Sequence, residues 1–306
     1  RRMGWLLVIG LIHAYLMWHG DILVTYAVCG LFIFLFRNSS VRKLVIWGLV
    51  FLIIGSSLSC LSGWSSQQWP PEVLTEMEEG FFPPAEKTAA EVADMQGGFA
   101  SQMKHRVAGS AFMHATVLPW FMFWRGVGVM LLGMALYRTG ILTGEASSRA
   151  YRTWVLLGLL VGLPLTYWGN LRTEAIDWDV IPSFFHMGQY SYWGSVLMAL
   201  GWISLWMLMR RRGVGEGLRV RLQAVGRMAL TNYLMQTVLC GLIFTGTGLG
   251  LFGQVPRIGQ AGIVVLVWAV QLMWSPWWLA RFRFGPAEWL WRSLSYRKIQ
   301  PFRRLI

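Results

Sequence analysis

The sequence predicts an all-α, polytopic membrane protein with about eight transmembrane helices. Of its 306 residues, 55% are apolar and only 13% are charged, whereas about a quarter of the residues of a soluble domain are charged. Five long stretches also contain no Asp, Glu, Lys or Arg, and about 20 apolar residues in a helix cross a hydrocarbon core. These stretches are residues 44–71, 153–171, 180–209, 228–256 and 258–280. The composition excludes a disordered chain, a disulfide-stapled secreted domain and a small water-soluble enzyme.

Dividing the chain at its polar breaks predicts eight helices. The first two could be separate helices or one long helix. The expected helices cover residues 4–19, 21–36, 43–62, 107–137, 150–168, 184–209, 223–247 and 259–282. Residues 4–36 could instead form one tilted helix, which would reverse the side of every later loop relative to Arg1 and Arg2. We therefore predict a hairpin on the outer side, in which Gly20 permits the tight turn and Asp21 caps the second helix.

Residues 63–106 form the one large polar segment and hold seven of the fourteen acidic residues. The segment could be a solvated connection, but Phe81 and Phe82, among others, give it apolar surface to bury. We therefore predict a packed extracytoplasmic cap. It follows three helices in residues 1–62 and precedes a five-helix membrane core in residues 107–283.

The stretch 284–306 is predicted to form a cytoplasmic interfacial helix followed by a basic tail. It opens with Gly285 and Pro286, and proline is favoured in the first turn of a helix. Trp and Arg residues then alternate, a pattern typical of helices that lie in the membrane interface.

The basic residues are sorted by side of the membrane. Of the 27 Lys and Arg, 21 lie in the two chain ends or in the loops predicted on the same side of the membrane as those ends. Five lie in the loops on the opposite side, and Arg125 lies within a predicted span. Because cytoplasmic loops carry the excess of Lys and Arg, both ends are predicted to be cytoplasmic. This sorting explains the net charge of +13 without nucleic acid. Membrane lipids are the expected partners, and the oligomeric state stays open.

The motifs of familiar soluble enzymes are absent from the sequence. There is no Walker loop, dinucleotide fingerprint, HExxH or nucleophile elbow. Cys29, Cys60 and Cys240 each lie in an apolar run without metal-ligand spacing, so no metal site is expected. Ionisable groups inside the predicted helices are therefore the candidates for function, since a charge at membrane depth is costly.

His13 is the first of these groups, and Asp21 begins the helix that returns from it. An imidazole titrates near neutral pH, so His13 with a carboxylate nearby would make a general base. Alternatively, His13 hydrogen-bonds a neighbouring helix and Asp21 is only a helix cap. We select both as candidate catalytic residues.

His114 and Arg125 are eleven residues apart, close to three turns of an α-helix, so both are expected on one face. Pro119 between them could kink that helix. A guanidinium at the depth of Arg125 needs a carboxylate, carbonyl groups or an anionic ligand. We select His114 and Arg125 as candidate ligand-binding residues, with a purely structural partner for Arg125 as the alternative.

Arg227, Asn232 and Tyr233 are the remaining candidate ligand-binding residues. Arg227 stands at the inner end of its helix beside other arginines, which could collect a phosphorylated ligand or simply follow the positive-inside rule. Amides in membrane helices commonly join neighbouring helices, which is the alternative role for Asn232 and for Gln236 one turn later.

Three segments closely resemble the YeiB-like bacterial membrane proteins, a family of unknown function, and occur in the family's order. They are GLIHAYLMWHGDIL (10–23), GRMALTNYLMQT (226–237) and FGPAEWLWR (284–292). The resemblance runs along almost the whole chain. Members typically carry additional transmembrane sequence before the first segment, which implies ten helices as the natural count.

The family is grouped distantly with transmembrane acyltransferases, and this resemblance implies transfer of an acyl group from cytoplasmic acyl-CoA to an unknown acceptor, either a lipid or a small molecule. The alternative is a transporter or flippase for an anionic lipid or solute, with Arg125 as the counter-charge in its path. The sequence shows no internal repeat, which favours transfer over transport.

Overall fold

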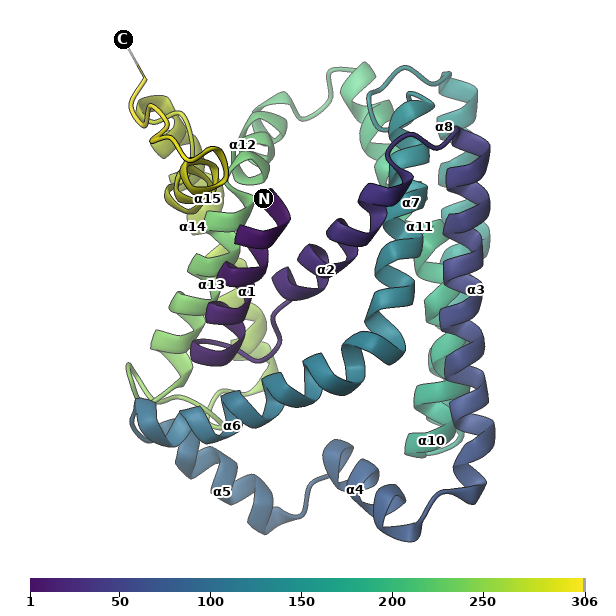
Figure 1. The fold of residues 1–306 in the computed structure, drawn as a ribbon, viewed down its shortest axis with the longest axis vertical. Helices are drawn as coiled ribbons and strands as arrows, with labels where there is room; N and C mark the ends of the chain where they lie inside the picture. The colour runs from purple at the N-terminus through teal and green to yellow at the C-terminus, as the bar shows by residue number, and fades with distance from the viewer. Residues whose placement is uncertain (305–306) are drawn as a thin grey trace. The chain divides into compact units, whose positions relative to one another are not determined.

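The computed structural model describes residues 1–304, and its regular elements are helices (Figure 1). No β-strand occurs in that range, although Phe282 and Arg303 form an isolated antiparallel bridge. The α-helices are α1 (Arg2–Leu16), α2 (Leu23–Ile33), α3 (Val41–Ser65), α4 (Pro71–Phe81), α5 (Ala85–Gln96), α6 (Phe99–Phe112), α7 (Phe123–Arg138), α8 (Ser148–Leu157), α9 (Leu163–Ala175), α10 (Val180–Pro182), α11 (Gly188–Arg211), α12 (Glu216–Arg227), α13 (Ala229–Phe244), α14 (Arg257–Arg281) and α15 (Pro286–Tyr296). The 3-10 helices are η1 (Phe34–Phe36) and η2 (Ser66–Gln68), and the π-helices are η3 (Met113–Met122), η4 (Gly158–Gly162) and η5 (Ser183–Met187).

The prediction of an all-α helical membrane protein is confirmed. Within the described residues, five continuous helical segments are long and apolar enough to cross a membrane: Val41–Gln68, Phe99–Arg138, Ser148–Ala175, Val180–Arg211 and Arg257–Arg281. The other predicted spans fall on three shorter apolar helices, Arg2–Leu16, Leu23–Phe36 and Ala229–Phe244. The first two are the arms of the predicted hairpin.

The chain divides into two compact units that do not follow the order of the sequence. Unit 1 comprises Arg1–Val28, Ala85–Ala115 and Gly215–Ile306, and unit 2 comprises Cys29–Pro84 and Thr116–Val214. The segment 63–106, predicted as one cap, is divided between the units after Pro84. The division leaves η2 and α4 in unit 2 and places α5 and α6 in unit 1.

In unit 2, α3 and α7 pack along each other, as Figure 1 shows for the dark blue and teal helices. Glycine permits the close approach: a Cβ on Gly128 would lie 2.9 Å from the carbonyl oxygen of Gly48. The helical run from α8 to α9 packs on α11 in the same way, with Gly158 against Gly201. Small residues at contacts of this kind are typical of helices in a bilayer, where dispersion forces between closely spaced backbones replace the hydrophobic effect.

In unit 1, α1, α13 and α15 share a small core that includes Leu6 and Leu230. The carboxylate of Glu288, in the first turn of α15, is 9% exposed and accepts hydrogen bonds from the backbone N–H of Thr231 (3.0 Å) and from its hydroxyl (2.5 Å). The N-terminal turn of α13 is thereby capped by a carboxylate from another helix, which satisfies an otherwise unpaired amide. The Trp291 indole also donates to the carbonyl of Arg2, which joins α15 to α1.

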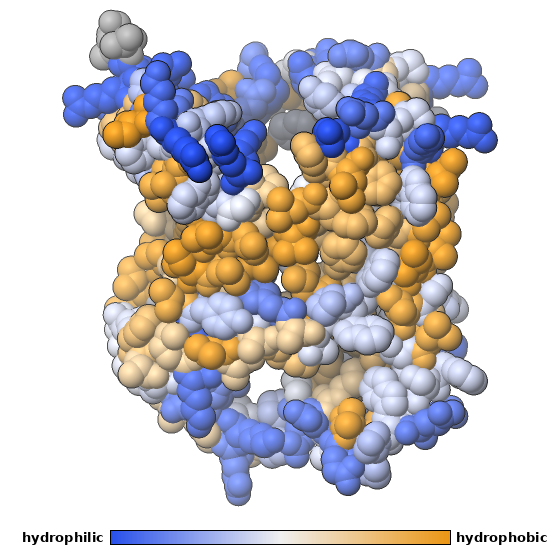
Figure 2. All heavy atoms as spheres, viewed as in Figure 1, coloured by the Kyte–Doolittle hydropathy of each residue, from blue (hydrophilic) through white to orange (hydrophobic). Residues whose placement is uncertain are grey.

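Large apolar side chains cover the outward sides of the long helices in both units. They appear as orange surface, and hydrophilic residues, in blue, gather near the helix ends (Figure 2). Trp202 on α11 and Trp268 on α14 are 67% and 58% exposed. A hydrocarbon environment would cover such surfaces, as expected for membrane helices.

Candidate functional site

The hairpin between α1 and α2 brings His13 and Asp21 together in a buried pair. His13 lies in the last turn of α1 and is 1% exposed, and Asp21, just before α2, is 3% exposed. The Nδ1 atom of His13 lies 2.7 Å from Oδ1 of Asp21. A carboxylate at this distance fixes the ring orientation and favours the tautomer with its proton on Nδ1, which leaves Nε2 as the basic nitrogen.

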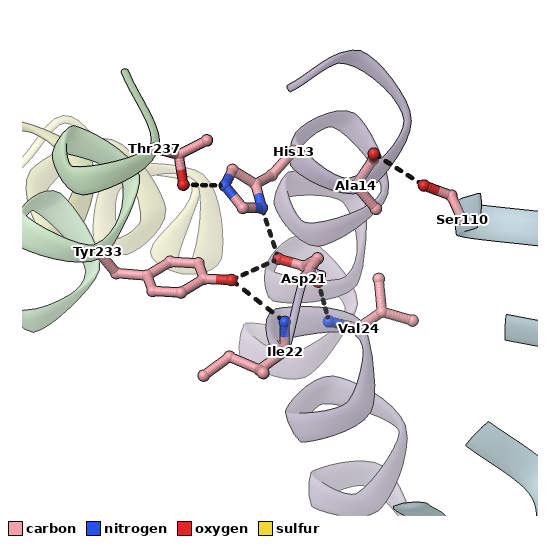
Figure 3. Close-up of polar contacts among 8 residues, drawn as sticks. All are labelled: His13, Ala14, Asp21, Ile22, Val24, Ser110, Tyr233 and Thr237. Carbon is pink, nitrogen blue, oxygen red and sulfur yellow. Dashed lines mark hydrogen bonds and ion pairs between the residues drawn. The ribbon is translucent and has the colours of Figure 1, made fainter. Parts of the chain in front are cut away.

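Helix α13 supplies two hydroxyl groups to this pair (Figure 3). Oγ1 of Thr237 lies 2.9 Å from Nε2 of His13. The Tyr233 hydroxyl, one turn earlier, donates to Oδ1 of Asp21 (3.3 Å) and accepts from the backbone N–H of Ile22 (3.2 Å). The result is a continuous polar chain from Asp21 through the imidazole of His13 to the hydroxyl of Thr237.

Asp21 contacts both His13 and the first turn of α2. Its Oδ2 accepts a 2.8 Å hydrogen bond from the backbone N–H of Val24 in the first turn of α2, while Oδ1 holds His13. The role predicted for Gly20 requires correction, because Gly20 is not among the glycines with positive φ. A Cβ there would instead lie 2.5 Å from Cζ2 of Trp18, so a larger residue would have to displace the Trp18 ring.

A cavity of about 880 Å³ lies beside Thr237, within unit 1. Met95, Phe244 and Phe252 contribute to its apolar walls, and Thr237 and Tyr233 line it. The residues that line it do not include His13, which is buried behind Thr237. This volume and this lining are typical of a site for a small molecule or a lipid chain.

The cavity also has a polar region with a buried cation. Arg106 is 7% exposed as a residue, and its guanidinium donates to the carbonyl of Leu16 (2.9 Å) and to Oε1 of Gln102 (2.6 Å). No carboxylate among residues 1–304 forms an ion pair with it. A guanidinium has five N–H donors, so Arg106 retains capacity to bind an anionic group inside the cavity.

His19 lines the cavity beside Arg106, in the connection between α1 and α2. Burial lowers the pKa of His19 because it disfavours the charged form, and the nearby His105 and Arg106 act in the same direction. The carboxylate of Glu91 opposes this shift. The net effect is a lower pKa, so His19 is more readily neutral than an exposed histidine.

The pairing predicted for His114 and Arg125 requires correction. Residues Met113–Met122 form a π-helix that contains Pro119, so the α-helical repeat of 3.6 residues does not apply between them. The two residues also belong to different units. The ring of His114 packs against Tyr15 at 5.6 Å, and within the described residues its buried Nδ1 has no hydrogen-bond partner.

Arg125 has the structural partners that the alternative prediction required. Its guanidinium donates to the carbonyl of Tyr192 and to the hydroxyl of Ser195, both at 2.8 Å, and lies 4.3 Å from the centre of the Tyr192 ring. Carbonyl, hydroxyl and aromatic groups thus stabilise this cation without a ligand.

Arg227 and Asn232 lie outside the polar chain around His13. Arg227 is exposed at the end of α12, where its guanidinium makes a long contact of 3.5 Å with the carbonyl of Arg283. The buried amide of Asn232 donates to the carbonyl of Val225 and to the hydroxyl of Ser275, both at 3.1 Å. Asn232 therefore joins α12, α13 and α14, which was its alternative role.

Sequence reasoning missed Thr237 and Arg106. A threonine in an apolar helix commonly bonds to its own backbone, so Thr237 gives no functional signal of its own. Its spacing of four residues from Tyr233, on one helix face, was the available indication. Arg106 was assigned to the polar segment, whereas α6 extends across that boundary and buries it.

Comparisons with known proteins identify relatives along nearly the whole chain. Residues 136–298 match the family described as "Protein of unknown function (DUF418)". A protein of Escherichia coli (strain K12) described as "Uncharacterized protein YeiB" is 30% identical over 98% of this chain and 76% of its own length. "Uncharacterized protein YxaH" of Bacillus subtilis (strain 168) is 30% identical over 98% of this chain and 72% of its own length. No solved structure matches the chain.

Proposed function

This chain belongs to the YeiB-like DUF418 family, and from that premise we propose that it is a membrane-embedded acyltransferase. The acyl donor is cytoplasmic acyl-CoA, and the acceptor is a hydroxyl or amine group of a lipid or small molecule. The membrane is a bacterial inner membrane, with both ends of the chain described here in the cytoplasm. The observation that carries the proposal is the buried hydrogen bond of 2.7 Å between His13 and Asp21.

General-base catalysis needs an imidazole with one nitrogen held and the other directed at a hydroxyl. Asp21 holds Nδ1 of His13, and Nε2 meets a hydroxyl at 2.9 Å, within the range for proton transfer. The Tyr233 hydroxyl and the backbone of α2 bind the carboxylate and stabilise its position. Asp21 is therefore the positioning residue, and His13 is the base.

The adjoining cavity supports a substrate that is partly apolar and partly anionic. Its apolar walls suit an acyl or lipid chain, and the buried Arg106 suits a phosphate or carboxylate. Arg227 stays a proposed contact for the CoA phosphates, since its guanidinium is exposed. Thr237 lies about 12 Å along α13 from the first residue of that helix, at 1.5 Å per residue. The extended arm between the phosphates and the thiol of CoA can span that distance.

Transport is the weaker alternative. It rested on Arg125 as the counter-charge in the path of an anionic substrate, whereas the Arg125 guanidinium is bound by Tyr192 and Ser195. The buried cation that lines a cavity in unit 1 is Arg106.

The test is release of free CoA thiol from acetyl-CoA by the purified protein in detergent, with bacterial lipid extract as the source of acceptor. His13→Gln should lower the rate by about 100-fold or more, because it removes the base and keeps a hydrogen-bonding side chain. His105→Gln is the matched control, since His105 also bonds an aspartate, Asp94, at 2.8 Å but is 30% exposed. An unchanged rate for His13→Gln, or no thiol release by the unchanged protein, would contradict the proposal.

A further inference from the structure

Thr237 stands between the base and the cavity. Its Oγ1 lies 2.9 Å from Nε2 of His13, and Thr237 is among the residues that line the cavity. His13 is 1% exposed and is not among the lining residues. A substrate in the cavity therefore meets Thr237 before it meets the imidazole.

The order of groups is that of an activated hydroxyl nucleophile. Asp21 bonds Nδ1 of the imidazole, and Nε2 meets the hydroxyl, so a carboxylate, a base and an alcohol follow in line (Figure 3). An alcohol is a weak nucleophile until a base takes its proton, and this geometry supplies the base. His13 and Asp21 belong to the hairpin, and Thr237 belongs to α13. Because these residues are far apart in sequence, the arrangement is recognised from its geometry and not from a sequence motif.

We propose that Thr237 is the first acyl acceptor and carries the acyl group as a covalent ester. This inference rests on the acyltransferase function proposed above. It adds a nucleophile and a two-step reaction, in which the donor releases CoA before the final acceptor reacts.

In the first step, the proton of the Thr237 hydroxyl passes to Nε2 of His13, and the hydroxyl oxygen attacks the thioester carbonyl of acyl-CoA. The carbon–sulfur bond breaks, and the CoA sulfur leaves with the proton from Nε2. In the second step, the acceptor hydroxyl gives its proton to Nε2, and its oxygen attacks the ester carbonyl. The bond to Oγ1 breaks, and Thr237 regains the proton.

The first step needs only the donor, so it can be tested before the acceptor is known. The purified chain in detergent is incubated with radiolabelled acetyl-CoA, denatured, and mapped by peptide mass spectrometry. The expected label is an acetyl ester on Thr237. Thr237→Val, which keeps the shape and removes the hydroxyl, should carry no label there, and Thr237→Ser should retain it. His13→Gln should label at least about 100-fold more slowly.

Controls separate this chemistry from a fold defect and from thiol acylation. Thr153→Val removes an exposed helical hydroxyl that bonds its own backbone, and it should label normally. Monodisperse elution identifies the variants that are folded, and Thr237→Ser retains a folded nucleophile if Thr237→Val does not fold. Cys240 also lines the cavity, but a thioester on it would be released by hydroxylamine at neutral pH, unlike an ester.

The outcomes distinguish the two proposals. If Thr237→Val releases CoA thiol at the full rate while His13→Gln does not, transfer is direct, and the covalent step is wrong while the acyltransferase function stands. Label on Cys240 in place of Thr237 would also contradict the covalent role of Thr237, but it would leave the acyltransferase function standing. If the unchanged protein neither labels nor releases thiol, both proposals fail.

Discussion

The guanidinium of Arg106 in α6 donates a 2.9 Å hydrogen bond to the backbone carbonyl of Leu16, the last residue of α1. The last carbonyls of a helix lack partners within it, and a cation is favourable at that end of the helix dipole. One side chain therefore anchors the end of α1, three residues after His13, and places a positive charge at the cavity.

Arg106→Gln should lower the free energy of unfolding by about 1.5–3 kcal/mol, because buried hydrogen bonds from a charged donor are lost. The measurement is denaturant unfolding in detergent. Arg172→Gln, at an exposed position in α9, is the control and should change stability by less than about 0.5 kcal/mol. Equal stability of both variants would show that Arg106 does not anchor α1.

An anionic amphiphile should stabilise the protein more than a zwitterionic one with the same chain, because Arg106 retains N–H donors in the cavity. The expected result is a higher Tm in the presence of a lysophosphatidic acid than with the matching lysophosphatidylcholine. Arg106→Gln should remove the difference. A preference for the anionic lipid that persists in this variant would place the anion elsewhere.

Two substitutions of Asp21 should separate its roles. Asp21→Asn keeps a side-chain oxygen for the N–H of Val24 but removes the charge that stabilises a protonated His13. It should lower acyl transfer by about 100-fold or more at little cost in stability. Asp21→Ala should also destabilise the protein by about 1 kcal/mol, since the helix cap is lost. Thiol release and denaturant unfolding, measured on both variants, provide the check. Full activity in Asp21→Asn would show that Asp21 serves only as the cap of α2.

The stability of the protein should fall at mildly acidic pH through His19. Its pKa lies below 6.5 in the folded state because of burial, so the unfolded chain binds the proton more readily. Stability contributed by neutral His19 is therefore complete above pH 6.5 and is lost as pH falls from there through the folded pKa. In a plot of Tm against pH, the fall in Tm over this window should be smaller for His19→Asn than for the unchanged protein. An identical slope in both proteins would exclude His19 as the source.

The sorting of basic residues predicts the orientation of unit 2. In a variant without the native cysteines, a cysteine at exposed Glu78 should react with an impermeant thiol reagent from outside the cell. A cysteine at exposed Val214 should be protected until the membrane is opened. The reverse labelling pattern would show that the predicted orientation is wrong, and it would contradict a cytoplasmic acyl-CoA as the donor.

The sequence was sufficient for the helical class and for the hairpin that carries His13 and Asp21, because apolar runs and a polar turn are local signals. The contact of His13 with Thr237 joins residues 224 positions apart, and one sequence contains no local signal of it. The π-helix from Met113 to Met122 was missed for a related reason. A π-helix differs from an α-helix only in its hydrogen-bond spacing, and residue type hardly determines that spacing. Gly20 was predicted to permit the tight turn, whereas its close approach to the Trp18 ring becomes visible only in three dimensions.

The cap that Glu288 places on the first turn of α13 has a consequence for biosynthesis. Tyr233 and Thr237 leave the ribosome on a helix whose Thr231 amide is not yet paired, because the carboxylate that pairs it follows 57 residues later. His13, in α1, is synthesised 224 residues before Thr237, the residue that its Nε2 contacts. The backbone N–H of Thr231 can therefore gain its carboxylate partner only after α15 has been synthesised.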